Sequence, residues 1–260
     1  MTNDSKITVV LTACIQPLAN MAAHIQRVDP EERLKDYRAA LTFWLQLPDS
    51  RITHLIFIDN SDYPLAELEG HAAQQNAFGR KCEFISLPAM PLPPDLHYGY
   101  LEFRILDEGF AKSKIYGETP YFMKVTGRYR FPTITRLLNS LPDSFKVAVD
   151  SRDNDRFTRW PRHFTAAALL IFQTAYYNEH LRLIHHQMRP APPMRKQFIE
   201  DVLFDFLIPN RGKKDFVLRW SVNCDPEGIG ASGDSYASRR KQLISLARAI
   251  GRKVIPWWWF

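Results

Sequence analysis

Two uninterrupted apolar runs rich in β-branched residues constrain the fold of this chain more than any other feature. They span residues 7–14 (ITVVLTAC) and 52–58 (ITHLIFI). A strand carries such a run when both of its faces are buried, as in a parallel sheet covered by helices. Between them, Asp29 and Pro30 followed by two glutamates form a helix-start signal, and we expect a helix over 29–47. The sequence therefore predicts a strand–helix–strand unit of an α/β protein.

The rest of the chain continues this alternation of strands and helices. Further strands are predicted at 82–86, 121–125, 145–149 and 216–222, and further helices at 98–112, 163–184, 195–207 and beyond 238. The apolar stretch 164–177 is broken by Thr165, Gln173 and Thr174, so we interpret it as a buried helix and not as a membrane span. We expect a Rossmann-like, mostly parallel sheet flanked by helices in one domain over 1–237, followed by a tail over 238–260.

Composition limits the class of protein. With 260 residues, of which 45% are hydrophobic, the chain can bury a full core. Its cysteines, Cys14, Cys82 and Cys224, are far apart and match neither a disulfide framework nor a zinc site, which favours a reducing cytoplasm. The polar residues at 1–6 exclude a signal peptide, so we expect a cytoplasmic protein. The net charge of +6 equals the number of cationic residues in 239–253, so the excess belongs to the tail.

Residues 121–131 (YFMKVTGRYRF) combine a strand with a basic turn. The polar and glycine positions of this segment are Lys124, Thr126, Gly127, Arg128 and Arg130. Glycine lets the backbone bend tightly or approach a ligand, arginine offers a planar fork of donors and lysine offers a point charge. These groups together suit a diphosphate. The alternative is an ordinary strand with a solvated basic end.

Polar residues also follow the other predicted strands. They are Cys14 after the first, Asp59 and Asn60 after the second, and 150–153 (DSRD) after the strand at 145–149. In α/β sheets, ligands bind beyond the carboxyl ends of the strands. We therefore expect these residues and the basic turn to converge on one binding site.

On this order of elements the chain resembles nucleotide-sugar glycosyltransferases of the GT-A fold, over about residues 5–235. More narrowly, it looks like the small bacterial enzymes that build lipopolysaccharide O-antigen or capsule. The first strand and the second strand ending in 58–61 (IDNS) match the nucleotide-binding half of that family. The resemblance implies that Asp59, with Asn60 beside it, contacts the base or ribose of the donor.

The chain departs from the family pattern at the metal-binding DxD. At the corresponding place it has 124–130 (KVTGRYR), so we predict that cationic side chains hold the diphosphate without a metal. The alternative is that Asp150 and Asp153, which have a DxxD spacing after a strand, bind Mg²⁺ or Mn²⁺. The same loop also reads as a polar segment with internal Asp–Arg pairs.

Two later segments carry further family features. Glu200 and Asp201, followed by apolar residues, resemble the Glu-Asp motif that supplies the catalytic base of inverting GT-A enzymes, although such a pair is also common as surface charge. An acceptor hydroxyl must lose a proton as it attacks the anomeric carbon, and a carboxylate can take it. The glycine-rich segment 224–236 suggests a lid over phosphate, or an ordinary connector.

The tail predicts contact with a membrane surface. Leu243, Ala247, Ile250 and Val254 form a helical apolar stripe among six cations, and the chain ends in 256–260 (PWWWF). A basic amphipathic helix with clustered tryptophans suits the interface of an anionic leaflet. The alternative is that the tryptophans pack back on the domain.

The sequence thus predicts a hexosyltransferase-like enzyme that moves a sugar from a nucleotide-sugar donor to a lipid-linked or other glycan hydroxyl in surface polysaccharide synthesis. It would lie on the inner face of the cytoplasmic membrane, and inversion follows if the base is Glu200 or Asp201. One rival is a nucleic-acid-binding protein, suggested by 156–162 (RFTRWPR) but disfavoured because the excess charge lies in a tail that ends in tryptophans. Another is a non-catalytic scaffold of the same fold.

Overall fold

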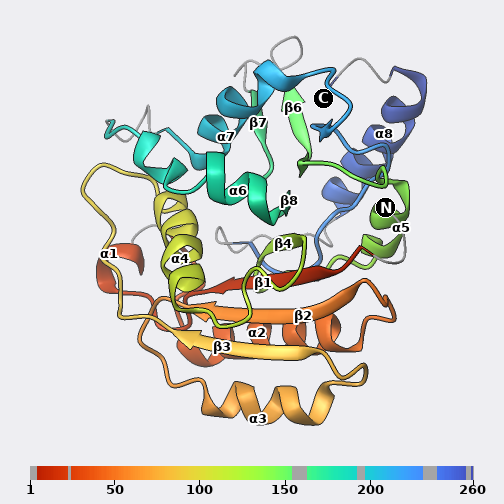
Figure 1. The fold of residues 1–260 in the computed structure, drawn as a ribbon. Helices are drawn as coiled ribbons and strands as arrows, with labels where there is room; N and C mark the ends of the chain where they lie inside the picture. The colour runs from red at the N-terminus through yellow and green to blue at the C-terminus, as the bar shows by residue number, and fades with distance from the viewer. Residues whose placement is uncertain are drawn as a thin grey trace.

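A seven-stranded, mostly parallel sheet organises the protein (Figure 1). The computed structural model describes residues 5–22, 25–153, 163–191, 197–230, 239–255 and 259. The strand order is β3-β2-β1-β4-β8-β5-β9. The first four strands run parallel to one another, and their bounds are β1 Ile7–Ala13, β2 Ile52–Asp59, β3 Lys81–Ser86 and β4 Tyr121–Thr126. The predicted α/β sheet is confirmed.

The second half of the sheet corrects one prediction. Residues 163–184, expected to form a helix, contain the strands β7 (His163–Thr165) and β8 (Leu169–Gln173) and only a short helix, α6 (Thr174–His180). Strand β8 runs antiparallel to β4 on one side and to β5 (Val147–Ala148) on the other. A short apolar run such as LLIF has the same hydrophobic pattern in a buried strand as in a buried helix, so periodicity could not distinguish them.

The remaining strands are short. Strand β9 (Phe216–Val217) pairs in parallel with β5 at the edge of the main sheet. Strand β6 (Ser151–Asp153) pairs with β7 in a separate two-stranded sheet. Strand β6 therefore leads the chain away from the main sheet immediately after Asp150.

Helices cover both faces of the main sheet, and each face has its own apolar core. Side chains of α2, α3 and α5 pack in one core, and those of α4, α6 and α7 pack in the other. The helices are α1 Ala19–Ala22, α2 Pro30–Gln46, α3 Ala66–Gln75, α4 Gly99–Lys112, α5 Ile134–Ser140, α7 Ile199–Leu207 and α8 Arg239–Val254, with 3-10 turns η1 Ile184–Gln187 and η3 Ile208–Asn210. In β1, Val9 and Leu11 enter one core and Val10 enters the other. This alternation explains the uninterrupted apolar run.

The carboxyl end of β4 lies directly against that of β1. Gly127 donates its N–H to the Thr12 carbonyl at 2.8 Å, and a Cβ at Gly127 would come within 2.6 Å of that same oxygen. The glycine is therefore needed for the two strand ends to meet, since a side chain would push them apart.

Helix α4 has one buried charge that its sequence pattern did not predict. Asp107 is buried and accepts hydrogen bonds from the Tyr177 hydroxyl at 3.0 Å and from the Leu183 N–H at 2.9 Å. These contacts join α4 to α6 and to the turn before η1. Among the described residues, none of the helices has the length and apolar character needed to cross a membrane.

Candidate active site

A cavity of about 290 Å³ opens at the carboxyl ends of β1, β2 and β4. Strand ends contribute Cys14, Asn60, Thr126 and Arg128 to its lining, and the helices α2, α4 and α7 contribute Arg33, Tyr37, Glu102 and Glu200. Residues from well-separated parts of the chain therefore meet where an α/β sheet binds its ligands.

Arg128 is the most unusual residue of this cavity. Its exposed fraction is only 7%, and its Nη1 atom is buried. Within the described residues its guanidinium makes no hydrogen bond and no ion pair. A buried charge without a partner is unfavourable, so an acceptor that enters the cavity would stabilise this side chain.

Lys124 is placed differently from Arg128. It is 0% exposed, and its ammonium contacts the Glu102 carboxylate and donates to the Ala167 carbonyl at 2.5 Å. The Thr126 hydroxyl donates to the same Glu102 carboxylate at 2.7 Å. The charge of Lys124 is therefore balanced inside the protein, and Thr126 and Glu102 lie between it and the cavity.

Arg130 lies away from the cavity lining. Its guanidinium is 3.7 Å from the Glu227 carboxylate, and the side chain is 43% exposed. The main chains of these two residues also form a β-bridge. Arg130 thus joins the basic turn to the late loop, whose Gly230 lines the cavity. Residues 231–236 of the predicted lid lie outside the described residues.

Asp59 and Asn60, at the end of β2, have different environments. The Asp59 carboxylate is fully buried and accepts from the Ile15 N–H at 2.8 Å, the Ser61 N–H at 2.8 Å and the Ser61 hydroxyl at 2.6 Å. Burial raises the pKa of Asp59 even though these donors favour its charged form. Asn60 faces the cavity, and its buried Oδ1 has no hydrogen-bond partner among the described residues. The Asp59 carboxylate therefore holds the backbone of Ile15 and Ser61 in place. Asn60 is the residue of this pair that lines the cavity.

Glu200 and Asp201, which the sequence could not separate, have different environments. The Asp201 carboxylate accepts from the Phe198 N–H at 3.0 Å and so caps the start of α7. Glu200 lines the cavity. Only Glu200 is therefore placed to exchange a proton with a ligand in the cavity.

Glu102 is a cavity residue that the sequence reasoning missed. Its carboxylate organises the cavity wall through Lys124 and Thr126. The cavity-facing side of this helix consists of Tyr98, Leu101, Glu102 and Ile105. This spacing is one helical face, and an acid on an otherwise apolar face was the available signal.

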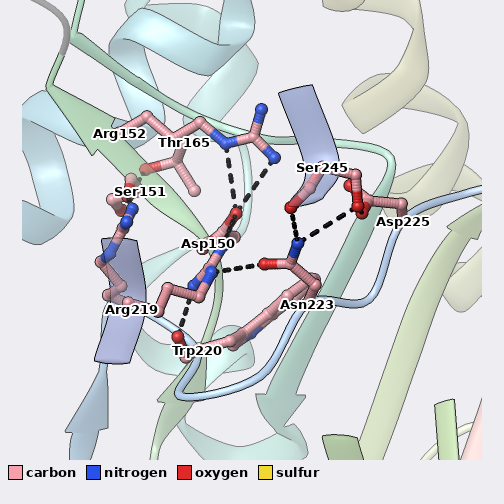
Figure 2. A network of polar contacts seen from close by, with 10 residues as sticks. Asp150, Ser151, Arg152, Thr165, Arg219, Trp220, Asn223, Asp225 and Ser245 are labelled. Carbon is pink, nitrogen blue, oxygen red and sulfur yellow. Dashed lines mark hydrogen bonds and ion pairs between the residues drawn. The ribbon is translucent and has the colours of Figure 1, made fainter. Parts of the chain in front are cut away.

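Asp150, one of the two candidate metal ligands, lies in another environment, a polar network at the C-terminal helix (Figure 2). Asp150 is 1% exposed, and both of its carboxylate oxygens accept from Arg252 of α8 at 2.8 Å. Arg152 donates to the same carboxylate at 3.1 Å. Burial by itself would raise the pKa of Asp150, but Arg152 and Arg252 hold it below its usual value. Asp150 and Arg152 therefore form an internal Asp–Arg pair, as in the alternative interpretation of this loop.

The network extends along α8 and reaches the chain end. Arg252 also donates to Asn223 Oδ1 at 2.7 Å, and the Asn223 amide donates to the Ser245 carbonyl at 2.6 Å. The Asp153 N–H is bonded to the Trp259 carbonyl. In the described part of the chain, no group of three or more His, Cys, Asp and Glu side chains has the arrangement of a metal site.

Helix α8 is oriented with part of its charge inward and its apolar stripe outward. Arg252 is buried, while the exposed fractions of Leu243, Leu246, Ile250 and Val254 are 55–68%. The expectation that all six cations flank the stripe is therefore wrong for Arg252. The side chains of residues 239–241 lie outside what is described.

Of the predicted aromatic cluster at 256–260, the structure describes Trp259. Trp259 is 9% exposed, joins the core that contains α4, and stacks under the Arg211 guanidinium at 4.2 Å. This tryptophan therefore packs back on the domain. The other aromatic residues of 256–260 lie outside the described residues, as does the segment 156–162 that suggested nucleic acid.

No protein-family model and no curated protein matches the chain. Solved structures resemble it at low identity. One is a mannosyltransferase from Pyrobaculum calidifontis in complex with GDP-Man and Mn²⁺, with 9% identity, TM-score 0.48, and coverage of 97% of this chain and 65% of that chain. Another is a glycosyltransferase involved in glycosylation of the major capsid of PBCV-1, with 10% identity, TM-score 0.41, and coverage of 82% and 81%. A third is named a glucose-1-phosphate thymidylyltransferase from Bacillus anthracis, in complex with a sucrose, with 12% identity, TM-score 0.45, and coverage of 94% and 95%.

Proposed function

We propose that this protein is a glycosyltransferase that uses a nucleotide-sugar donor and binds it in the cavity at the strand ends. The observation that carries the proposal is the buried, unpartnered guanidinium of Arg128 in a cavity that also contains Glu200. Sugar transfer from a diphosphate donor to a hydroxyl requires a cation that stabilises the leaving diphosphate and a base that accepts the hydroxyl proton. A guanidinium and a carboxylate in one cavity can supply these two groups. Asn60, at the end of β2, supplies a polar contact for the nucleoside.

The proposed reaction assigns one role to each of these groups. The acceptor hydroxyl attacks the anomeric carbon, the bond from that carbon to the diphosphate oxygen breaks, and Glu200 takes the hydroxyl proton. Arg128 stabilises the charge that develops on the leaving diphosphate. Attack from the side opposite the leaving group inverts the anomeric carbon, so inversion is part of this proposal.

Lys124 has an indirect role in this scheme. Because Glu102 already balances its charge, Lys124 supports the wall that carries Thr126 and Glu102. Its predicted direct contact with the diphosphate stays a prediction, as do those of Gly127 and Arg130. A divalent ion is compatible with the proposal, and the Glu102 carboxylate is a cavity oxygen that could contact one.

Helix α8 motivates a proposal for the acceptor and the location of the enzyme. We propose that its exposed stripe lies on an anionic membrane surface, where a lipid-linked glycan of surface polysaccharide synthesis would be presented. The six cations of 239–253 equal the net charge of the chain, and those other than Arg252, which is buried against Asp150, would complement such a surface. A stable protein interface takes about 20 to 30 residues from each side, far more than one helical stripe offers, so a second copy fits less well.

Vesicle binding tests the membrane proposal. Full-length protein should sediment with vesicles that contain phosphatidylglycerol and remain soluble with phosphatidylcholine alone, and the double change Leu246→Gln with Ile250→Gln should abolish sedimentation. The matched control is Phe78→Gln, which removes an exposed apolar side chain remote from α8 in sequence. A monomer–dimer equilibrium that the α8 changes abolish, without vesicle binding by the wild type, would assign the stripe to a second copy instead.

The transferase proposal is tested by product analysis. The protein is incubated with UDP-, GDP-, dTDP- and ADP-sugars and a mixture of glycan acceptors, with Mn²⁺ or with EDTA. We expect release of one nucleoside diphosphate together with a glycoside, and loss of both products in Glu200→Gln. Stoichiometric release of inorganic pyrophosphate from a nucleoside triphosphate and a sugar phosphate would identify a nucleotidyltransferase and overturn the proposal.

A further inference from the structure

Arg33, at the start of α2, is a second buried guanidinium in the same cavity. It is 4% exposed, and it lines the cavity although no sequence pattern marked it. Its Nε donates to the Cys14 carbonyl at 2.6 Å, its Nη1 to the Arg27 carbonyl at 2.9 Å and its Nη2 to the Tyr37 hydroxyl at 3.1 Å. All three acceptors are neutral, so no carboxylate among the described residues balances the charge of Arg33.

These contacts fix the guanidinium without using all of its donors. An arginine has five N–H groups, and within the described residues the three hydrogen bonds of Arg33 use one N–H on each of its nitrogens, which leaves one on each terminal nitrogen. The side chain is therefore held rigidly, with two donors left for a ligand. Preorganisation of this kind lowers the entropy cost of binding.

Arg33 and Arg128 line the same cavity together with Cys14, whose carbonyl accepts from Arg33. Burial raises the pKa of the Cys14 thiol to about 11; Arg33 and Arg128 oppose that rise, and Asp59 adds to it. The thiol is therefore neutral near pH 7, and both guanidiniums are close enough to Cys14 for their charges to influence it. One comes from α2 and the other from the turn after β4, so they approach the cavity from different elements.

Two cationic groups of the cavity, Arg33 and Arg128, have no ion-pair partner among the described residues. In the cavity wall Lys124 is already balanced by Glu102. The Asp59 carboxylate, behind the wall, is occupied by the donors of Ile15 and Ser61. The Glu200 carboxylate also lines the cavity, so the two guanidiniums matter here as phosphate-binding groups and not through the net charge of the site. Guanidinium–phosphate pairs are bidentate and strong, and two guanidiniums suit the two phosphates of a diphosphate diester.

We propose that Arg33 and Arg128 form a two-guanidinium clamp for the diphosphate of the donor, with Arg33 as a donor-binding residue. This inference rests on the proposed function, because it names the groups that hold the donor in that same cavity. The clamp supplies two positive charges from the protein itself. Diphosphate binding should therefore persist when divalent ions are removed.

Calorimetric binding of inorganic pyrophosphate and of nucleoside diphosphates in EDTA tests the clamp. We expect wild-type protein to bind pyrophosphate, and Arg33→Gln and Arg128→Gln each to weaken it by about tenfold to a hundredfold, the range for hydrogen bonds to charged groups. The matched control is Arg27→Gln. Arg27 lies just before α2, where it pairs with Glu32 and Asp36, and it does not line the cavity. It should bind pyrophosphate within about twofold of wild type.

A second measurement does not depend on the folding of the Arg33 variant. Wild-type protein is treated with phenylglyoxal with and without pyrophosphate, and the modified arginines are mapped by mass spectrometry. We expect pyrophosphate to protect both Arg33 and Arg128 and to leave Arg104, which pairs with Glu108 on the surface, unprotected. Protection of Arg128 without Arg33 overturns the clamp.

The outcomes separate the clamp from the proposed function. Nucleoside diphosphate binding that is unchanged in Arg33→Gln overturns the clamp and leaves the transferase proposal standing. Pyrophosphate binding that needs both arginines, in a protein that transfers no sugar, supports the clamp and overturns the transferase proposal. A wild-type protein that binds neither pyrophosphate nor any nucleoside diphosphate overturns the clamp directly.

Discussion

The arginines of the α8 network and the arginines of the strand-end cavity differ in whether a carboxylate pairs with them among the described residues. In the network at α8, Arg252 and Arg152 converge on Asp150, and Arg252 makes further bonds to Asn223 and to the backbone. In the strand-end cavity, Arg128 has no partner among the described residues and Arg33 has only neutral ones. The first group stabilises the fold. The second group has no carboxylate partner among the described residues, so its charge is available to an anionic ligand. A binding site differs from a structural network in this respect.

The largest expected effect is on the α8 network. Arg252→Met leaves the Asp150 carboxylate buried and without its main partner, so the free energy of unfolding should fall by about 3–5 kcal/mol. Urea denaturation measures it. Arg152→Met is the control, because Arg152 is at the more exposed edge of the network, and it should cost about 1 kcal/mol or less. Equal costs for the two changes would contradict the assignment of Arg252 as the main partner.

Glu200 and Asp201 give the next contrast, this time between catalysis and capping. Glu200→Gln should reduce kcat by about a hundredfold to ten-thousandfold, because the base is lost, with little change in donor affinity. Asp201→Ala should lower the free energy of unfolding by about 1 kcal/mol, because the cap of α7 is lost. Transfer assays and urea denaturation on both variants test this, and a larger kcat loss in Asp201→Ala would reverse the two roles.

Arg128 should respond in the opposite sense to Arg252. Arg128→Met removes a buried charge that has no partner, so unfolding in the absence of ligand should cost the same free energy as wild type or about 1 kcal/mol more. Donor affinity should fall by about tenfold to a hundredfold. Arg104→Met serves as the control, because Arg104 pairs with Glu108 on the surface and does not line the cavity, and it should change neither quantity appreciably. Destabilisation of Arg128→Met as large as that of Arg252→Met would abolish the contrast between the two groups.

A smaller effect is expected on the pH dependence of stability. The folded-state pKa of Asp150 lies below the usual value, so its contribution is present above about pH 4 and is lost as the pH falls through the folded-state value. Asp59, whose pKa is raised by burial, changes stability in the opposite direction. Unfolding measured between pH 6 and pH 3 should therefore show a steeper acid loss in wild type than in Asp150→Asn. Parallel curves would mean that Asp150 gains nothing from its ionised form.

The sequence predicted the first half of the fold well because its signals are local. The apolar runs at β1 and β2 and the helix-start signal of α2 each lie within one element. Strand β8 was missed because its identity depends on pairing with β4 and β5, which no pattern inside five residues reveals. The same reason hid the role of Asp150, whose partner Arg252 lies 102 residues further along the chain.

The candidate site was predicted in part. The basic turn and the ends of β1 and β2 supplied Arg128 and Asn60, which line the cavity. Which neighbouring polar residue faces a ligand and which holds the backbone depends on three-dimensional contacts, as for Asn60 beside Asp59 and Glu200 beside Asp201. The sequence could not predict that Arg33 lines the cavity, because an arginine in the first turns of a helix usually faces solvent.

The central claim is that the cavity arginines are completed by a diphosphate. The most direct measurement is the free energy of unfolding of wild type and Arg128→Met in EDTA, with and without a nucleoside diphosphate at about 100 times its wild-type Kd. Wild type should gain about 2.7 kcal/mol, and Arg128→Met should gain about half of that or less. Equal gains in the two proteins, or no gain in wild type with any nucleoside diphosphate, would contradict the claim.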